Sequence, residues 1–135
     1  MNEKSAYDSI EIGLEVGPIE VELSEDKVKE YAEAIQWETS EGLVGINAVP
    51  PGITIVEHAR MNFSGEGAKL KAAIWAKSEH EFIKPIKIGS KVFIRGKVVE
   101  KYTKRDRNYA VSEYETVDEN GDLLMKSRET GLIIE

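Results

Sequence analysis

The feature that most constrains this fold is a short apolar helix that follows two prolines. Pro50 and Pro51 stop the preceding segment, because proline fixes its own φ and has no backbone donor. The residues from Pro51 to Phe63 then form a predicted helix whose apolar positions cover more than one stripe, as expected of a helix contacted from several sides. Most later segments are typical of strands. The sequence therefore predicts an α+β fold in which an antiparallel sheet wraps around one central helix.

Alternating and amphipathic patterns predict the elements around this helix. Residues 9–23 alternate apolar and polar side chains, which indicates one or two strands. Ser24 is the expected N-cap of a leading helix. That helix presents one buried face: Val28, Tyr31, Ala32 and Ile35. Residues 36–49 lose all periodicity and form a predicted loop, which is either one wall of a binding site or a plain connector. Further strands are expected within residues 72–83, 91–101, 109–117 and 123–134.

Composition narrows the class of protein. The 135 residues, 41% of them hydrophobic, are expected to form one domain over residues 1–135. The absence of cysteine excludes disulfides and thiolate metal sites and favours an intracellular setting. With 25 acidic and 18 basic residues the net charge is −7, which argues against nucleic acid or an anionic membrane as a partner. No signal-like or membrane-spanning run occurs, so we expect a soluble cytoplasmic protein.

Several motifs follow one another in a specific order and spacing. Tyr31-Ala32-Glu33-Ala34-Ile35 is followed by Val49-Pro50-Pro51-Gly52-Ile53, and then by the stretch from Glu79 to Gly89 with its Pro-x-x-x-Gly turn. Together they resemble the MaoC-like hot-dog dehydratases, and most closely the fatty-acid-synthase-type N-terminal dehydratase domain. The resemblance covers about residues 10–134. It implies a hot-dog fold, pairing of two hot dogs, and acyl thioester substrates on coenzyme A or a carrier protein. No separate cofactor is implied.

The resemblance also implies reversible hydration of an enoyl thioester, a hydro-lyase reaction of fatty acid metabolism. An enolate oxygen that develops negative charge would be stabilised by the free amides at the N-terminus of the central helix. We expect Gly52 and Ile53 to supply these amides, with Pro51 and Trp37 beside the substrate. The alternative for Gly52 is a glycine required only for packing.

The sequence departs from the family where its acid and base should lie. Active members carry Asp and His about five residues apart after the first long helix. Alignment through Tyr31 places Trp37 at the Asp position and Gly42 at the His position. Neither residue can transfer a proton. The sequence therefore gives no firm catalytic residue.

Other side chains are weaker candidates for a catalytic role. Glu38 and Glu41 lie in the same loop, although surface carboxylates are usually only solvated. His80 lies on a predicted strand, and His58 on the central helix is expected to be structural. Two histidines without cysteines predict no metal site. Glu57 is the candidate for a different chemistry, since hot-dog thioesterases use a carboxylate near this helix to activate water.

A basic segment offers a further candidate contact. The loop predicted from Tyr102 to Asn108 carries Lys104, Arg105 and Arg107, which could bind coenzyme A phosphates. The alternative is a solvated hairpin loop.

Three hypotheses about function follow. The first is a non-catalytic hot-dog subunit that pairs with an active subunit to form an enoyl-CoA hydratase or 3-hydroxyacyl dehydratase. The second is a hot-dog acyl-CoA thioesterase. The third is a non-enzymatic acyl-CoA-binding or scaffold module. The expected assembly is a hetero-oligomer, with a homodimer as the alternative, because a lone hot dog leaves a free edge strand.

Overall fold

A computed structural model describes residues 5–37, 48–61 and 72–134 of the chain. The described helices and strands follow in one order along the chain: α1 Ala6–Ser9, β1 Glu15–Glu22, α2 Glu25–Ala34, α4 Gly52–Met61, β2 Ala72–Phe82, β3 Lys91–Lys104, β4 Arg107–Val117 and β5 Leu123–Ile134. The five strands form one antiparallel sheet in the order β1-β3-β4-β5-β2. This architecture confirms the predicted α+β class.

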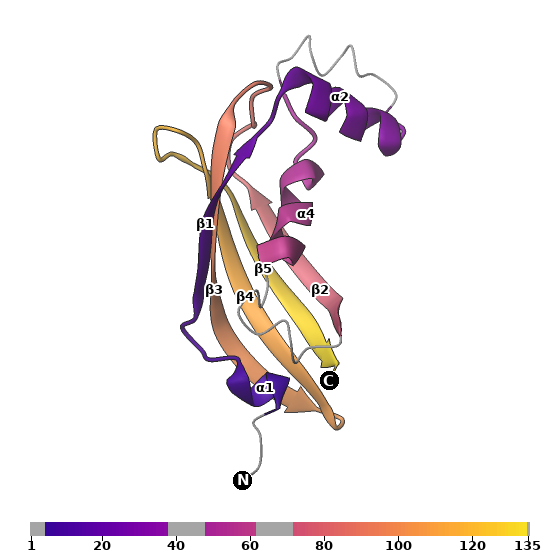
Figure 1. The fold of residues 1–135 in the computed structure, drawn as a ribbon, viewed down its shortest axis with the longest axis vertical. Helices are drawn as coiled ribbons and strands as arrows, with labels where there is room; N and C mark the ends of the chain where they lie inside the picture. Colours follow the sequence, from indigo (N-terminus) through magenta and orange to yellow (C-terminus); the bar gives the residue numbers. More distant parts are fainter. Residues whose placement is uncertain (1–4, 38–47, 62–71, 135) are drawn as a thin grey trace.

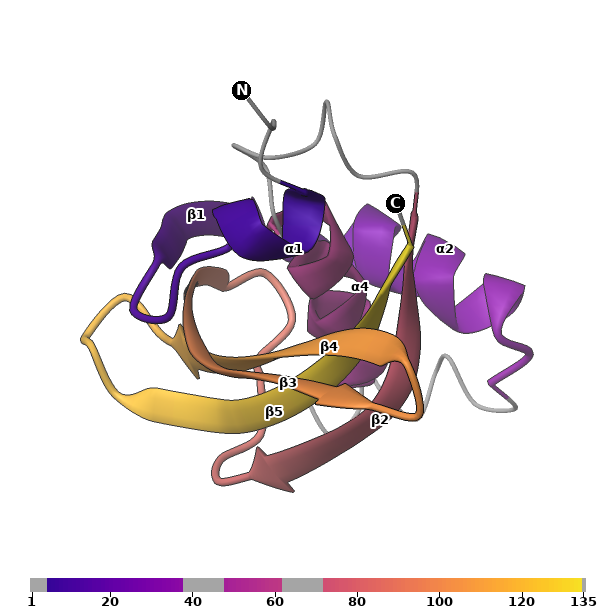
Figure 2. The same ribbon diagram turned by 90° about the horizontal axis from the view of Figure 1, so that it is seen from below.

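The sheet curves around α4. Figure 1 shows α4 lying against one face of the sheet, with α2 at one end and α1 near the other. Figure 2, viewed along the strands, shows the sheet bending around that helix. The prediction of a sheet wrapped around a single central helix is therefore confirmed.

Local sequence signals set both ends of α2. The Ser24 hydroxyl accepts a hydrogen bond from the Lys27 N–H at 3.2 Å, as an N-cap does. At the other end Gln36 adopts a φ of 58°, and the Trp37 N–H donates to the Ala32 carbonyl at 2.9 Å. This is a Schellman-type ending. Its consequence is that Trp37 is held directly after the helix rather than on a free loop.

The central helix differs from the predicted one in the residues that it buries. It begins at Gly52 and ends at Met61 within the described residues, so Phe63 lies outside them. Its buried side includes polar Glu57 and His58, whereas apolar Val56 is 46% exposed. The prediction that Val56 belongs to a buried apolar stripe is therefore wrong, because the face of α4 that meets the sheet packs through His58 on buried polar side chains.

Two apolar clusters form the core. The larger cluster joins α2, α4 and the sheet: Val21, Leu23, Val28, Val49, Ile53, Met61, Ile86, Val92, Ile94, Tyr114 and Leu124. The smaller cluster lies beneath α1: Ile10, Val98, Ala110 and Ile133. Helix α1, which the sequence did not predict, therefore closes the far end of the same sheet.

The basic segment also differs from its prediction. Strands β3 and β4 pair as far as Lys104 and Arg107, so the predicted seven-residue loop is a two-residue turn. The turn residues Arg105 and Asp106 have φ values of 52° and 62°. The sequence concealed this turn because such angles are usually marked by Gly or Asn. No helix among the described residues is long and apolar enough to cross a membrane.

Candidate functional site

At the N-terminus of α4, the Gly52 amide has no backbone partner among the described residues. The Ile53 N–H donates to the Pro50 carbonyl, and the Thr54 N–H donates to the Pro51 carbonyl, both at 3.1 Å. The Thr54 hydroxyl also donates to Pro51, at 2.8 Å. The Gly52 N–H donates to no backbone carbonyl within the described residues. Of the two amides expected to face an oxyanion, Gly52 is therefore the one that remains available.

A tyrosine hydroxyl from α2 lies against this amide-bearing residue. A β-carbon added to Gly52 would lie 2.6 Å from the Tyr31 hydroxyl oxygen. Tyr31 is half-buried and packs against the main core, so its position is fixed by α2. Gly52 is thus required by a close approach. The Tyr31 hydroxyl and the Gly52 N–H therefore both lie at the start of α4.

An apolar pocket opens at the same place. It has a volume of about 250 Å³. Its lining is mainly apolar and comes from the entry to α4, the end of β2 and the start of β5: Ala48, Val49, Pro51, Phe82, Ile83, Lys84, Pro85, Ile86, Leu124 and Met125. Small-molecule sites are commonly concave and mainly apolar, although this pocket is smaller than most of them.

Of the two positions expected to hold a catalytic acid and base, the structure describes only Trp37, which cannot transfer a proton. Trp37 is 45% exposed at the end of α2. Glu38, Glu41 and Gly42 lie outside the described residues. The described part of this region therefore adds an indole and no proton-transfer group.

A buried polar pair lies beneath the middle of α4. His58 from α4 is hydrogen-bonded through Nδ1 to a carboxylate oxygen of Glu129 on β5, and both residues are almost completely buried. The His58 ring stacks on Tyr114 of β4 with ring centroids 4.2 Å apart. Gly96 makes room for the Tyr114 ring, because a β-carbon there would approach it to 2.5 Å. His58 Nε2 and the second Glu129 oxygen have no partner in the described structure.

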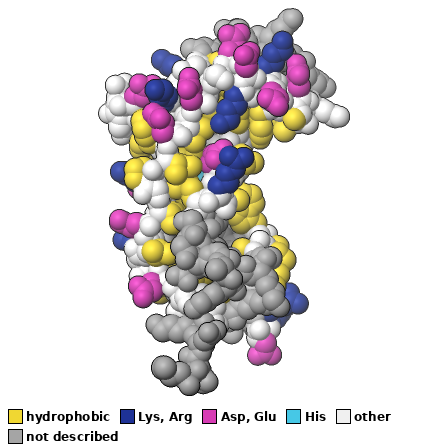
Figure 3. Space-filling model, in the orientation of Figure 1, with side chains coloured by type: hydrophobic (Ala, Val, Ile, Leu, Met, Phe, Trp, Pro, Cys, Tyr) yellow, Lys and Arg dark blue, Asp and Glu magenta, His cyan; other side chains and the backbone are white. Residues whose placement is uncertain are grey.

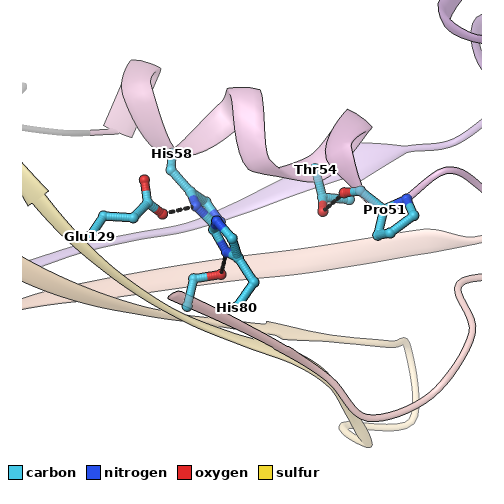
Figure 4. Close-up of polar contacts among 6 residues, drawn as sticks. Pro51, Thr54, His58, His80 and Glu129 are labelled. Atoms are coloured by element: carbon cyan, nitrogen blue, oxygen red, sulfur yellow. Dashed lines mark hydrogen bonds and ion pairs between the residues drawn. The ribbon is translucent and has the colours of Figure 1, made fainter. Parts of the chain in front are cut away.

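His80 extends this polar region to the edge strand. Its Nδ1 is hydrogen-bonded to the Ser127 hydroxyl at 2.7 Å. Figure 4 shows His80 beside His58, with Glu129 on the other side of the His58 ring. Burial lowers the pKa of His80, and the neighbouring Glu129 opposes this shift. His80 is therefore a neutral side chain at physiological pH.

Comparison of the whole fold with solved structures identifies the architecture. The chain superposes with a TM-score of 0.75 on a HadBC (3R-hydroxyacyl-ACP dehydratase) complex from Mycobacterium tuberculosis, covering 90% of this chain and 96% of that one at 14% identity. It also matches a MaoC-like dehydratase from Rhodospirillum rubrum with a TM-score of 0.66, at 16% identity and 93% and 94% coverage. The chain has the hot-dog fold.

A hydratase also has this fold, whereas the sequence comparisons find no match. The hot dog matches the (R)-hydratase from A. caviae involved in PHA biosynthesis with a TM-score of 0.61, at 15% identity and 91% and 96% coverage. No protein-family model matches the sequence, and neither does any curated protein sequence. The resemblance to MaoC-like dehydratases is therefore carried by the fold.

Glu57 is the buried carboxylate closest in sequence to the open end of α4. Its side chain is 10% exposed, and Arg60 Nη1 lies 3.5 Å from its Oε2. That distance is long for a hydrogen bond, and the Arg60 side chain is 77% exposed. Glu57 is therefore only loosely paired in this hot dog.

The basic turn lies at the opposite end of the hot dog from the pocket. Met125 lines the pocket, whereas the strand residues next to the turn pair near Ile133. Eight residues of β5 separate these points, which is about 26 Å of strand. Lys104, Arg105 and Arg107 therefore cannot approach a group held at Gly52 of the same subunit without spanning most of the sheet (Figure 1).

Sequence reasoning missed the His58–Glu129 pair. The two residues are 71 positions apart, and no local pattern links them. A weak signal existed in hindsight, because Glu129 falls in phase with the inward-facing residues of an alternating strand, where a carboxylate needs a partner. Within the described residues no group of three or more His, Asp or Glu side chains could hold a metal ion.

Proposed function

We propose that this hot dog is the non-catalytic subunit of an enoyl-thioester hydratase or 3-hydroxyacyl-thioester dehydratase that acts on acyl-CoA. The observation that carries the proposal is the open Gly52 amide at the N-terminus of α4, beside an apolar pocket. A helix N-terminus stabilises negative charge that develops on a thioester oxygen. The Tyr31 hydroxyl lies against Gly52 and would be the second donor in this proposal.

The residues described around Gly52 support a subunit that lacks its own catalytic acid and base. Hydration needs a group that delivers or removes a proton near the β-carbon. Trp37 stands where an aspartate is expected, and the described residues around Gly52 add only a phenol. The acid and base would therefore come from a partner subunit.

An edge strand of the sheet supports pairing with that partner. Strand β2 is at one edge of the sheet, and Trp75 and Phe82 on it are 45% and 57% exposed. Figure 3 shows hydrophobic side chains exposed beside α4 and beneath α2. A free edge with large apolar side chains is a site for pairing with another chain. Two of the matched hot dogs come from two-component complexes, HadBC and ChsH1-ChsH2.

The test is an activity assay with and without a partner. The purified chain is incubated with crotonyl-CoA and longer enoyl-CoAs, alone and with hydratase candidates from the same genome. We expect hydration of enoyl-CoA only when the chain is mixed with its catalytic partner. The rate of this hydration should be lower when the chain carries Gly52→Ala. Robust hydration by the chain alone would contradict the non-catalytic role. If the chain binds acyl-CoA but no partner restores turnover, the binding module is the better description.

Glu57 favours a thioesterase as the second candidate. A buried carboxylate with one loose partner on the central helix is suited to activate water. This function predicts release of free thiol from acyl-CoA by the chain alone. The release should be lost in Glu57→Gln and kept in Arg60→Gln. No thiol release at any chain length would eliminate it.

A further inference from the structure

The apolar pocket becomes polar along its strand walls. Phe82 lines the pocket on β2, and His80 is the next residue on the same face, with ring centroids 6.3 Å apart. Met125 lines the pocket on β5, and Ser127 is the next residue on that face. The register places Phe82 opposite Met125 and His80 opposite Ser127. On both strands the side chain therefore changes from apolar to polar at the first same-face position beyond the pocket lining.

The helix wall changes in the same direction. Pro51 lines the pocket, and Thr54 and His58 follow three and seven residues later on the same side of α4 (Figure 4). Thr54 and His58 are fully buried. His58 is bonded to Glu129, which is also buried. Beyond the pocket lining, the next residues along α4, β2 and β5 on the same faces are therefore polar.

These polar side chains offer no apolar surface to the hydrocarbon chain of an acyl group. Each methylene that leaves water for an apolar wall gains about 0.8 kcal/mol, which is about a fourfold gain in affinity. A methylene that reaches His80 instead faces a neutral polar ring bonded to Ser127, and behind it the His58–Glu129 pair. Separating either pair would leave buried polar groups unsatisfied. An acyl tail therefore gains nothing by extending past Phe82.

We propose that the site accepts thioesters of short acyl groups, and that the His80–Ser127 pair, supported by His58–Glu129, is the end wall that sets the chain length. This inference rests on the proposed function, since it assigns a substrate class to the same site. His80 is the specificity-determining residue, because it is half-buried and lies next to the pocket residue Phe82. Its neutral state follows from burial, which lowers its pKa.

The experiment measures binding of acetyl-, butyryl-, hexanoyl- and octanoyl-CoA to the full chain by calorimetry, with free coenzyme A as the reference. We expect affinity to rise about fourfold per methylene at first and then to stop rising before octanoyl-CoA. His80→Leu should extend the rise to octanoyl-CoA. His80→Gln, which keeps a polar wall, should retain the cutoff. Glu79→Leu is the matched control, because Glu79 is exposed on the adjacent position of the same strand, opposite Arg128.

The outcomes separate the two proposals. If no acyl-CoA binds more tightly than free coenzyme A, the proposed function fails and this inference fails with it. If the affinity of the natural sequence keeps rising up to octanoyl-CoA, the His80–Ser127 pair does not limit the chain length. The proposed thioester site is not refuted by that result. A cutoff that is unchanged in folded His80→Leu, or shifted equally by Glu79→Leu, would refute the role of His80. Ser127→Ala should relax the cutoff in the same direction as His80→Leu, and an unchanged cutoff would count against the pair.

Discussion

Removing His58 alone from the His58–Glu129 pair should cost more stability than removing both members. His58→Leu leaves the Glu129 carboxylate buried without its partner, and breaking a buried pair in this way costs about 3–5 kcal/mol. The loss of stacking on Tyr114 adds about 0.5–1.5 kcal/mol. Glu129→Leu leaves the buried Nδ1 of His58 without its partner, which costs about 1–3 kcal/mol.

The double variant should recover most of this loss. Replacing both partners by leucine removes every unsatisfied group that the single variants create, and such replacements of buried pairs are often neutral. We expect the double variant to lie within about 2 kcal/mol of the natural sequence and the coupling free energy to be about 3 kcal/mol or more. The assay is urea unfolding followed by circular dichroism at one fixed protein concentration.

A surface pair gives the control for this cycle. Lys84 and Asp122 lie 3.7 Å apart, and both side chains are more than half exposed. Their coupling should be below about 1 kcal/mol. If the effects of His58→Leu and Glu129→Leu simply add, the two residues do not form the buried pair described here, and the end wall behind His80 loses its support.

Three further predictions concern the pocket and the turns. Burial lowers the pKa of His80, so as the pH falls His80 is protonated in the unfolded chain before it is protonated in the folded chain. The free energy of unfolding should therefore fall as the pH drops below about 6.5. In His80→Gln, the free energy of unfolding measured in urea should depend less on pH between about 7.5 and 5.5. Gly52→Ala should cost about 1–3 kcal/mol and weaken acyl-CoA binding, because its methyl group meets the Tyr31 hydroxyl; adding Tyr31→Phe should restore part of the stability but not the binding. Replacing Arg105-Asp106 by Asn-Gly should raise the free energy of unfolding by about 1–2 kcal/mol, because both residues have positive φ; an unchanged urea midpoint would argue against this turn.

Local signals allowed the sequence to predict much of the fold. Ser24 was recognisable as an N-cap because capping depends on residues within one turn. The prolines before Gly52 predicted the start of the central helix for the same reason. The order of alternating strands, together with motif order, then indicated the hot-dog architecture that the structural comparisons confirm.

The features that the sequence did not predict depend on contacts between distant residues or on unusual residues at a turn. His58 and Glu129 meet only through the fold, so the polar interior beneath α4 had no local sequence signature. The turn at Arg105 was hidden because a non-glycine residue occupies a positive-φ position. Ile53 was a reasonable amide donor from its place in the helix, but its N–H is already bonded to Pro50.

The most direct test is the structure of the full chain bound to butyryl-CoA, alone or in complex with its catalytic subunit. We expect the thioester oxygen within hydrogen-bonding distance of the Gly52 N–H and the end of the acyl group between Phe82 and His80. We also expect any acid or base near the β-carbon to belong to the partner subunit. A thioester bound away from the N-terminus of α4 would refute the proposed site.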